Sequence, residues 1–380
     1  MDKKRKTIGL IFTGSSDWIG GLYYIANIVK SLSYLEIKDR PNVVLFYDKI
    51  TPKGLLKELD FNFVKQVDLY EINKIKRLFF SLLYRVLNRN YLFRYHIDKQ
   101  NVDVIYPLNY YHKDLEFINV EKLYWIFDFQ HKFLPQFFTK DEIKKRNKAF
   151  KEIADKANSV VVSSYTAKNH FYHFYPKSKA KVHVLQFVSI IDENKITDFN
   201  SLKEKYNIKT PYYLVSNQFW QHKNHMVVFE AINKLKKQNI EINVVFTGKE
   251  YEPRNPDYIV SIKEYIKINK LEKNIKMLGF IPREDQLGLM KNCIAIIQPS
   301  KFEGWGTVVE DAKSLGKQVI LSDIEIHREQ MLKDYLLFSV NDDKQLAELL
   351  SENKFKSNLY IEQNNKERYK TFATNINNII

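Results

Sequence analysis

The residues best suited to chemistry form an acidic, glycine-bearing segment at 303–311, which reads Glu-Gly-Trp-Gly-Thr-Val-Val-Glu-Asp. The segment follows a short apolar run and opens a helical pattern. Glycines let the backbone approach a ligand closely, and unpaired N–H groups at a helix start favour an anion. Carboxylates on both sides of that helix start, from Glu303 and from Glu310 or Asp311, can hold sugar and ribose hydroxyls by charge-assisted hydrogen bonds. A tight loop with an acidic capping cluster fits the same spacing equally well.

A second polar segment, at residues 216–225, reads Ser-Asn-Gln-Phe-Trp-Gln-His-Lys-Asn-His. It lies between an apolar run and a helical pattern. Lys223 in this segment suits the negative charge that develops on a leaving diphosphate. Taken alone, the segment fits better as a polar strand-to-helix loop with an exposed lysine.

Two further segments carry weaker signals. Gly20 and Gly21 precede the first helical pattern, where a glycine pair and a helix start can cradle a phosphate. An ordinary flexible loop fits the same pair. His131 follows a later apolar run and could hydrogen-bond a sugar hydroxyl, although a lone histidine is more often structural.

These segments are connected by short apolar runs that alternate with longer amphipathic ones. Strands separated by helices predict βαβ units and a parallel sheet. The pattern restarts after a polar stretch at 195–212, so we expect two doubly wound α/β domains, with ligands at the carboxyl ends of their strands. The predicted strands are 8–12, 43–47, 104–106, 123–126, 160–162, 213–215, 244–247, 275–278, 294–297 and 319–321, and the predicted helices are 22–32, 226–235, 258–268 and 307–314.

Composition excludes several classes of protein. The 380 residues are 44% hydrophobic and carry a net charge of +15, which is ordinary globular composition with a basic surplus. The single cysteine, Cys293, excludes an internal disulfide and a Cys₂His₂ zinc site, and it fits a reducing cytoplasm. The apolar run at 8–12 is too short for a signal peptide, and no run approaches the roughly 20 apolar residues of a membrane span.

A basic, aromatic stretch covers residues 73–96 and contains no acidic residue. It predicts one basic amphipathic helix, which could lie on an anionic membrane with about 1 kcal/mol from each basic residue near the surface. A core-packed helix with a solvated basic rim fits better, because the apolar positions go almost all the way round. Its basic residues are Lys74, Lys76, Arg77, Arg85, Arg89 and Arg94.

Together these segments resemble the retaining glycosyltransferases of glycosyltransferase family 4, which have the GT-B fold. The resemblance covers nearly the whole chain, from Gly20 to Glu329. Its most specific part is 303–311, which matches that family's E-x7-E element with Asp311 at the second acidic position and Glu310 just before it. The family's diphosphate-binding arginine and lysine lie five residues apart. Here Lys223 matches the lysine, but Gln218 replaces the arginine, which removes a bidentate phosphate fork.

The resemblance also implies roles for other positions. His131 aligns with a histidine near the donor sugar, 278–281 resembles the loop whose backbone reads the nucleobase, and 247–249 resembles a loop near the nucleotide. It implies catalytic roles for His131, Lys223 and Glu303. The implied donor-binding residues are Gly20, Gly21, Gln218, Lys223, Thr247, Gly248, Gly279, Phe280, Ile281, Glu303, Gly304, Trp305, Gly306, Thr307, Glu310 and Asp311.

The resemblance implies an N-terminal acceptor-side Rossmann-like domain at 1–200 and a C-terminal nucleotide-sugar-binding domain at 201–360. A C-terminal helix at 361–380 would pack back on the first domain. The implied activity is hexosyltransferase-like transfer from a nucleotide-sugar to a glycan or lipid-linked acceptor, with retained anomeric configuration. It would serve bacterial cell-surface polysaccharide assembly, in the cytoplasm or at the inner face of the membrane, with no cofactor and no catalytic metal.

Three other functions are alternatives. A nucleotide-sugar epimerase would use the same architecture but would convert the nucleotide-sugar without an acceptor; a glycoside phosphorylase would need a cofactor lysine that the sequence does not reveal. A basic nucleic-acid-binding protein belongs to a different class. The sequence has no recognised RNA- or DNA-binding motif, so we expect no nucleic-acid partner.

Overall fold

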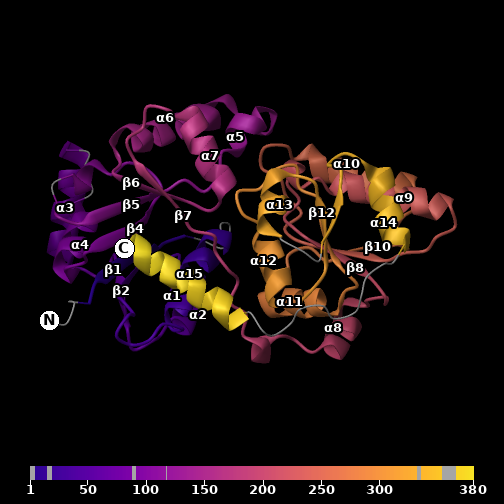
Figure 1. Ribbon diagram of the computed structural model, residues 1–380, viewed down its shortest axis with the longest axis horizontal. Helices are drawn as coiled ribbons and strands as arrows, with labels where there is room; N and C mark the ends of the chain where they lie inside the picture. The colour runs from indigo at the N-terminus through magenta and orange to yellow at the C-terminus, as the bar shows by residue number, and fades with distance from the viewer. Residues whose placement is uncertain (1–4, 15–18, 88–90, 117, 332–334, 353–364) are drawn as a thin grey trace. The chain divides into compact units, whose positions relative to one another are not determined.

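The computed structural model describes residues 5–14, 19–87, 91–116, 118–331, 335–352 and 365–380 (Figure 1). Its contacts divide the chain into two compact units. Unit 1 comprises Met1–Phe129, Lys144–Val188 and Lys366–Ile380, and unit 2 comprises Gln130–Ile143 and Ser189–Asn365. The chain thus passes from unit 1 to unit 2 and back twice, and its C-terminal end belongs to unit 1.

Unit 1 is built on a seven-stranded sheet in the order β3-β2-β1-β4-β5-β6-β7, in which every neighbouring pair is parallel. The central strands are buried on both faces, as expected where helices cover a parallel sheet on both sides. The strands are Thr7–Phe12 (β1), Asn42–Tyr47 (β2), Val64–Asp68 (β3), Val104–Leu108 (β4), Glu121–Trp125 (β5), Ser159–Val162 (β6) and Lys181–Val184 (β7). The helices of this half are Ile19–Leu32 (α1), Lys53–Glu58 (α2), Lys74–Leu87 (α3), Tyr91–Gln100 (α4), Lys113–Leu115 (η2), Lys140–Lys156 (α6) and Tyr165–Phe174 (α7).

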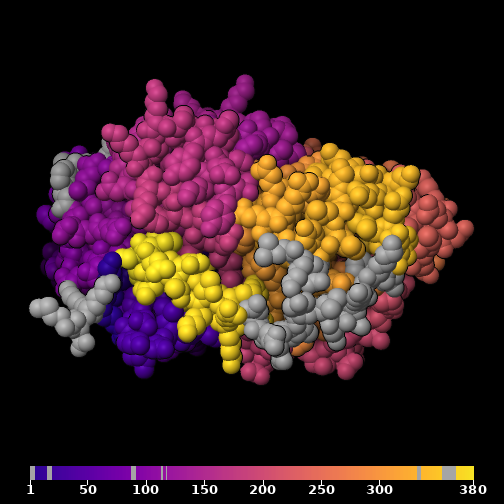
Figure 2. Space-filling model, viewed as in Figure 1, coloured from indigo at the N-terminus to yellow at the C-terminus, as the bar shows by residue number. Residues whose placement is uncertain are grey.

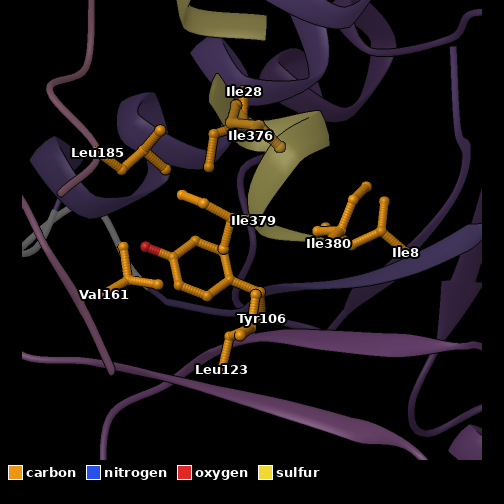
Figure 3. Close-up of a pocket in the computed structure, with 9 residues that line it drawn as sticks. All are labelled: Ile8, Ile28, Tyr106, Leu123, Val161, Leu185, Ile376, Ile379 and Ile380. Atoms are coloured by element: carbon orange, nitrogen blue, oxygen red, sulfur yellow. The ribbon is translucent and has the colours of Figure 1, made fainter. Parts of the chain in front are cut away.

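The C-terminal helix, Asn365–Ile379 (α15), packs on unit 1. Figure 2 shows it lying over the surface of the N-terminal part of the chain. The rings of Tyr34 and Tyr369 are 5.3 Å apart, and Asn377 Nδ2 donates to the Asp39 carbonyl at 3.0 Å. Ile376 and Ile379 close a small apolar cavity above the ring of Tyr106 (Figure 3). The buried side chains of α15 are Tyr369, Phe372, Ala373 and Ile376, and this helix belongs to unit 1.

Unit 2 is built on a six-stranded parallel sheet in the order β10-β9-β8-β11-β12-β13. Alternating side chains of its strands enter two separate cores, one on each face. The strands are Tyr213–Ser216 (β8), Val244–Thr247 (β9), Ile275–Met277 (β10), Ile296–Gln298 (β11), Val319–Ser322 (β12) and Tyr335–Phe338 (β13). The helices are Gln130–Phe133 (α5), Pro135–Phe137 (η3), Glu193–Lys195 (η4), Phe199–Tyr206 (α8), Gln221–Lys223 (η5), His225–Lys237 (α9), Asp257–Ile268 (α10), Arg283–Asn292 (α11), Thr307–Ser314 (α12), Glu325–Gln330 (α13) and Asp343–Glu352 (α14).

The predicted fold class, two doubly wound parallel-sheet domains, is confirmed. The single helix predicted over 73–96 is wrong, because α3 and α4 are separate helices. The core-packed interpretation of this stretch is wrong for α3, whose side chains are mostly exposed. Arg89 lies outside the described residues. Within the described residues, the longest apolar helix still falls short of what a bilayer crossing requires.

Candidate functional site

Most of the predicted site residues lie at the carboxyl ends of β8, β9 and β11 in unit 2. β8 is central and has β9 on one side and β11 on the other, so the strand order reverses there. Open α/β sheets bind ligands at such a reversal, because the two flanking loops diverge and leave a crevice between them. The loop after β8 leads through η5 into α9, and the loop after β11 leads into α12.

An ion pair joins these two loops. Lys223 Nζ lies 2.6 Å from Glu303 Oε1, and the two side chains are only 16% and 9% exposed. The same oxygen accepts from Ser300 Oγ at 2.6 Å and from Gln298 Nε2 at 2.9 Å. Within the described part of the chain, Glu303 Oε2 receives no hydrogen bond. One carboxylate oxygen therefore anchors the loop, and the other is available to a ligand hydroxyl.

The Glu303 carboxylate is ionised at neutral pH. Burial by itself would raise its pKa, but the charge of Lys223 and the hydrogen bonds from Lys223 and Ser300 outweigh burial and lower the pKa to about 2. A carboxylate with so low a pKa is a poor proton acceptor near pH 7. This environment suits orientation of a ligand rather than proton transfer.

Two buried histidines flank Lys223. Burial, followed by the nearby charge of Lys223, lowers the pKa of both His222 and His225 to about 3, so both are neutral at pH 7. His225 stacks on Phe219 with ring centroids 4.3 Å apart. Next to them, Asn224 adopts a left-handed backbone conformation, and its Nδ2 donates to the Pro299 carbonyl at 3.1 Å. The loops after β8 and β11 are thereby fixed to each other.

Acidification is expected to destabilise the fold through these histidines. Below pH 6.5 the unfolded chain binds protons that the folded chain excludes, so the free energy of unfolding falls as the pH falls toward the folded pKa. Between pH 6.5 and pH 3.5 each histidine contributes a loss of about 4 kcal/mol. The variant His225→Phe should show a shallower dependence of melting temperature on pH, measured by circular dichroism.

The matched control is His173→Phe, which replaces an exposed histidine in α7 and should leave the wild-type slope unchanged. Equal pH slopes for wild type and His225→Phe would contradict a neutral buried imidazole at this position.

The loops after β8, β9 and β10 meet through a glycine that no other residue can replace. Gly248 has φ +141°, and a Cβ there would lie 2.0 Å from the Asn217 carbonyl oxygen. Its N–H donates to the Gly279 carbonyl at 2.8 Å, and the hydroxyls of Ser216 and Thr247 are 2.8 Å apart. The ends of β8, β9 and β10 are thus drawn together. In the loop after β10, the side chain of Phe280 is 63% exposed and that of Ile281 is buried.

The start of α12 is held by one glutamine. Gly306 precedes the helix; its N–H donates to Gln330 Oε1 at 3.1 Å, and its carbonyl accepts from Gln330 Nε2 at 2.8 Å. Gln330 Nε2 also donates to Glu310 Oε1 at 2.9 Å, and Lys313 Nζ lies 2.9 Å from the same oxygen. Trp305 and Glu310 are both buried. These hydrogen bonds connect the start of α12 to the end of α13.

Asp311 lies in a different network from Glu310. It is fully buried and accepts from both terminal nitrogens of Arg283, at 2.7 and 2.5 Å, and from Ser189 Oγ at 2.5 Å. The second acidic position, counted by spacing, is thus paired with an arginine that the sequence analysis did not single out. Arg283 is the first residue of α11, and its only sequence signal is the proline that precedes it.

A second cation lies beside the site. Arg254 Nε is 3.0 Å from Glu142 Oε1, and its guanidinium lies 4.3 Å from the ring centroid of Phe138. The buried carboxylate of Glu252 accepts from the backbone N–H groups of Gln221 and Arg254, which fixes Arg254 to η5. A pocket of about 360 Å³ opens here, lined by Gln136, Phe138, Thr139, Gln221, Arg254 and Asn255, with Phe137.

The predicted histidine belongs to the same unit. His131 lies in α5 and is 1% exposed, with its ring 6.3 Å from that of Phe138. In the same helix, Phe133 stacks on Phe302 at 5.6 Å, directly before Glu303 in the chain. The segment carrying His131 therefore lies against the Glu303 loop.

Most of the predicted positions lie in unit 2, whereas Gly20 and Gly21 belong to the first turn of α1 in unit 1. Residues 15–18, which precede this glycine pair in the chain, lie outside the described residues. Among the described residues, no group of three or more His, Cys, Asp or Glu side chains is arranged to hold a metal ion. The predicted positions that belong to unit 2 are His131, Gln218, Lys223, Thr247, Gly248, Gly279, Phe280, Ile281, Glu303, Gly304, Trp305, Gly306, Thr307, Glu310 and Asp311.

Comparison with known proteins matches the second half of the chain to a protein family. Residues 198–368 match the family described as Glycosyl transferases group 1, so the chain contains a glycosyltransferase group 1 domain. Over 186 residues the chain is 26% identical to the O-antigen chain mannosyltransferase RfbU of Salmonella typhimurium. That match covers 49% of this chain and 48% of the relative, so it spans about half the length of the curated relative.

Solved structures share the fold over nearly the whole chain. A glycosyltransferase from Rickettsia africae has a TM-score of 0.63 at 18% identity, over 99% of this chain and 93% of its own. Anabaena HepE, crystallised with UDP and glucose, has a TM-score of 0.63 at 17% identity, over 99% of this chain and 94% of its own. At these identities the likeness establishes the GT-B fold alone.

Proposed function

We propose that the protein is a retaining glycosyltransferase of glycosyltransferase family 4. It transfers a hexosyl group from a nucleotide-sugar to a glycan or lipid-linked acceptor in bacterial cell-surface polysaccharide assembly. The observation that carries this proposal is the buried pair of Lys223 and Glu303 at the carboxyl ends of β8 and β11. The group 1 domain, the named activity of the Salmonella relative and the UDP and glucose bound by Anabaena HepE support it.

In this reaction Lys223 carries the positive charge that faces the leaving diphosphate. Its ammonium is already held by Glu303, so it needs little reorganisation when negative charge develops. The backbone N–H groups at the start of α12 add partial positive charge, since the first turn of a helix leaves them without intrahelical partners. Positioning and charge stabilisation together supply the rate enhancement.

Glu303 orients the donor sugar. Because Glu303 Oε1 already accepts hydrogen bonds from Lys223, Gln298 and Ser300, the other oxygen, Oε2, accepts the hydrogen bond from a sugar hydroxyl. A carboxylate whose pKa is about 2 is also a weak nucleophile, which favours attack of the acceptor on the same face that the diphosphate leaves. Such a front-face reaction retains the anomeric configuration and needs no covalent enzyme intermediate.

Arg254 compensates for the glutamine at position 218. After burial and the charge of Lys223, the charge of Arg254 also lowers the pKa of His222, so both cations lie near one imidazole. Glu252 fixes Arg254 to the loop that carries Lys223. We assign Arg254 as the second cation of the diphosphate site, and we place no catalytic metal in the reaction.

A panel of UDP-, GDP- and dTDP-sugars, incubated with and without a bacterial lipid-linked oligosaccharide extract, tests the proposal. We expect release of one nucleotide diphosphate that depends on the extract and persists in EDTA, with an NMR coupling constant that reports the donor's own anomeric configuration in the product. Conversion of the donor sugar without the extract would identify an epimerase instead. Inverted product would exclude the retaining mechanism.

A further inference from the structure

Helix α3 exposes an apolar stripe that the described residues of unit 1 do not cover. The stripe follows the spacing i, i+3, i+4, i+7 and i+11, so its members share one face of the helix. The opposite face is the one that packs inward, where the ring of Phe80 lies 5.6 Å from that of Tyr95 in α4. The exposed fractions on the stripe are 78% for Ile75, 76% for Leu78, 55% for Phe79, 59% for Leu82 and 72% for Val86.

This arrangement differs from scattered surface hydrophobics. From Ile75 to Val86 the stripe is continuous over 11 helical steps, about 16 Å at 1.5 Å per residue. A contiguous exposed apolar surface of this kind marks an interaction site, because its hydration is unfavourable. The helix has two apolar faces, which is why its sequence resembles that of a buried helix.

The charges around the stripe have one sign. Lys74 and Arg85 are eleven residues apart and lie on one edge of the stripe, and both are exposed. Lys76 Nζ lies 5.0 Å from the ring centroid of Tyr95 in α4. The acids nearest in sequence are Glu71 before α3 and Asp98 in α4, and Asp98 is paired with Arg94 at 3.5 Å. The partner of this face must therefore be apolar and rimmed by negative charge.

We propose that α3 docks on an anionic lipid bilayer, with the stripe in the acyl boundary and the basic residues among the lipid phosphates. A basic amphipathic helix lying in the membrane plane has this pairing of one apolar face and cationic flanks. A second copy of the chain would bring like charges together, and a nucleic acid would leave the apolar stripe in water. This inference does not rest on the proposed sugar transfer, because it concerns binding in the absence of any donor.

Vesicle flotation of the full chain tests the proposal. At low salt we expect the protein to float with vesicles of phosphatidylglycerol and phosphatidylcholine, and to stay behind with phosphatidylcholine alone. The variant Phe79→Ser/Leu82→Ser keeps every charge and should lower the partition coefficient by at least about tenfold. Lys74→Gln/Arg85→Gln should lower it about fivefold for each charge removed.

The matched control is Val260→Ser/Ile268→Ser, which changes two exposed apolar residues of α10 in unit 2, 54% and 77% exposed, and should leave flotation unchanged. Both apolar variants should keep the wild-type melting temperature, since none of these side chains is buried. Absence of flotation at low salt, equal binding to uncharged vesicles, or a stripe-dependent dimer in sedimentation without lipid would each overturn the proposal.

Discussion

Replacing Lys223 with methionine is expected to lower the turnover number for sugar transfer by roughly 10²–10³-fold. The reason is the loss of the cation that faces the leaving diphosphate, a contribution made mainly as negative charge develops. We expect the Michaelis constant for the donor to change less than the turnover number, because an interaction that strengthens in the transition state affects turnover more than ground-state binding. Initial rates over a range of donor concentrations separate the two constants.

The same substitution removes the partner of a buried carboxylate. Without Lys223, burial is no longer outweighed and the pKa of Glu303 should rise. Breaking a buried pair from one side destabilises a protein by about 3–5 kcal/mol. The double variant Lys223→Met/Glu303→Gln should recover most of the melting temperature but none of the activity. Full transfer activity in Lys223→Met would remove the proposed site.

The variant Arg254→Gln, at the edge of the site, should lower the turnover number by about tenfold.

The sequence predicted the central strands because their apolar runs are continuous. The three strands it missed, β3, β7 and β13, are edge strands of the two sheets. β3 reads Val-Lys-Gln-Val-Asp and β7 reads Lys-Val-His-Val, so polar residues interrupt both. β3 and β7 have one neighbour each and more contact with solvent, so their sequences carry a weaker apolar signal. β13 reads Tyr-Leu-Leu-Phe, so polar interruption does not explain why it was missed.

Helix α3 shows a different limit of sequence reasoning. Periodicity reveals how many faces of a helix are apolar, but not which of them the fold covers. Phe80 and Phe79 are adjacent in sequence, yet Phe80 packs against α4 while Phe79 is 55% exposed. Only the tertiary structure distinguishes a buried helix from one that keeps an apolar face for a partner.

At the site, spacing identified the segment at 303–311 but not the residues that hold it. Lys223 and Glu303 are 80 positions apart and meet because β8 and β11 are neighbours. Gln298 ends an apolar strand, and its amide reaches both Asn217 and Glu303. Such amide contacts have no local sequence pattern, because they depend on which strands are paired.

The variant Arg283→Gln is expected to destabilise unit 2 by about 3–5 kcal/mol, because it leaves the fully buried Asp311 carboxylate without its cation. For a unit of this size the loss corresponds to a fall of roughly 10 °C in melting temperature. Calorimetry measures it, and Arg283→Gln/Asp311→Asn should regain most of the loss, since no buried charge remains.

The pair of variants also separates the two acidic positions. Each carboxylate is held in its own network, Asp311 by Arg283 and Glu310 by Lys313 and Gln330. If Asp311 serves only this ion pair, the double variant has the wild-type Michaelis constant for the donor, and Glu310→Gln raises it. If Asp311 itself binds the ribose, the double variant regains stability while the Michaelis constant stays high. An unchanged melting temperature in Arg283→Gln would mean that Asp311 is not held by Arg283 in solution, so that its carboxylate is already available to a ligand.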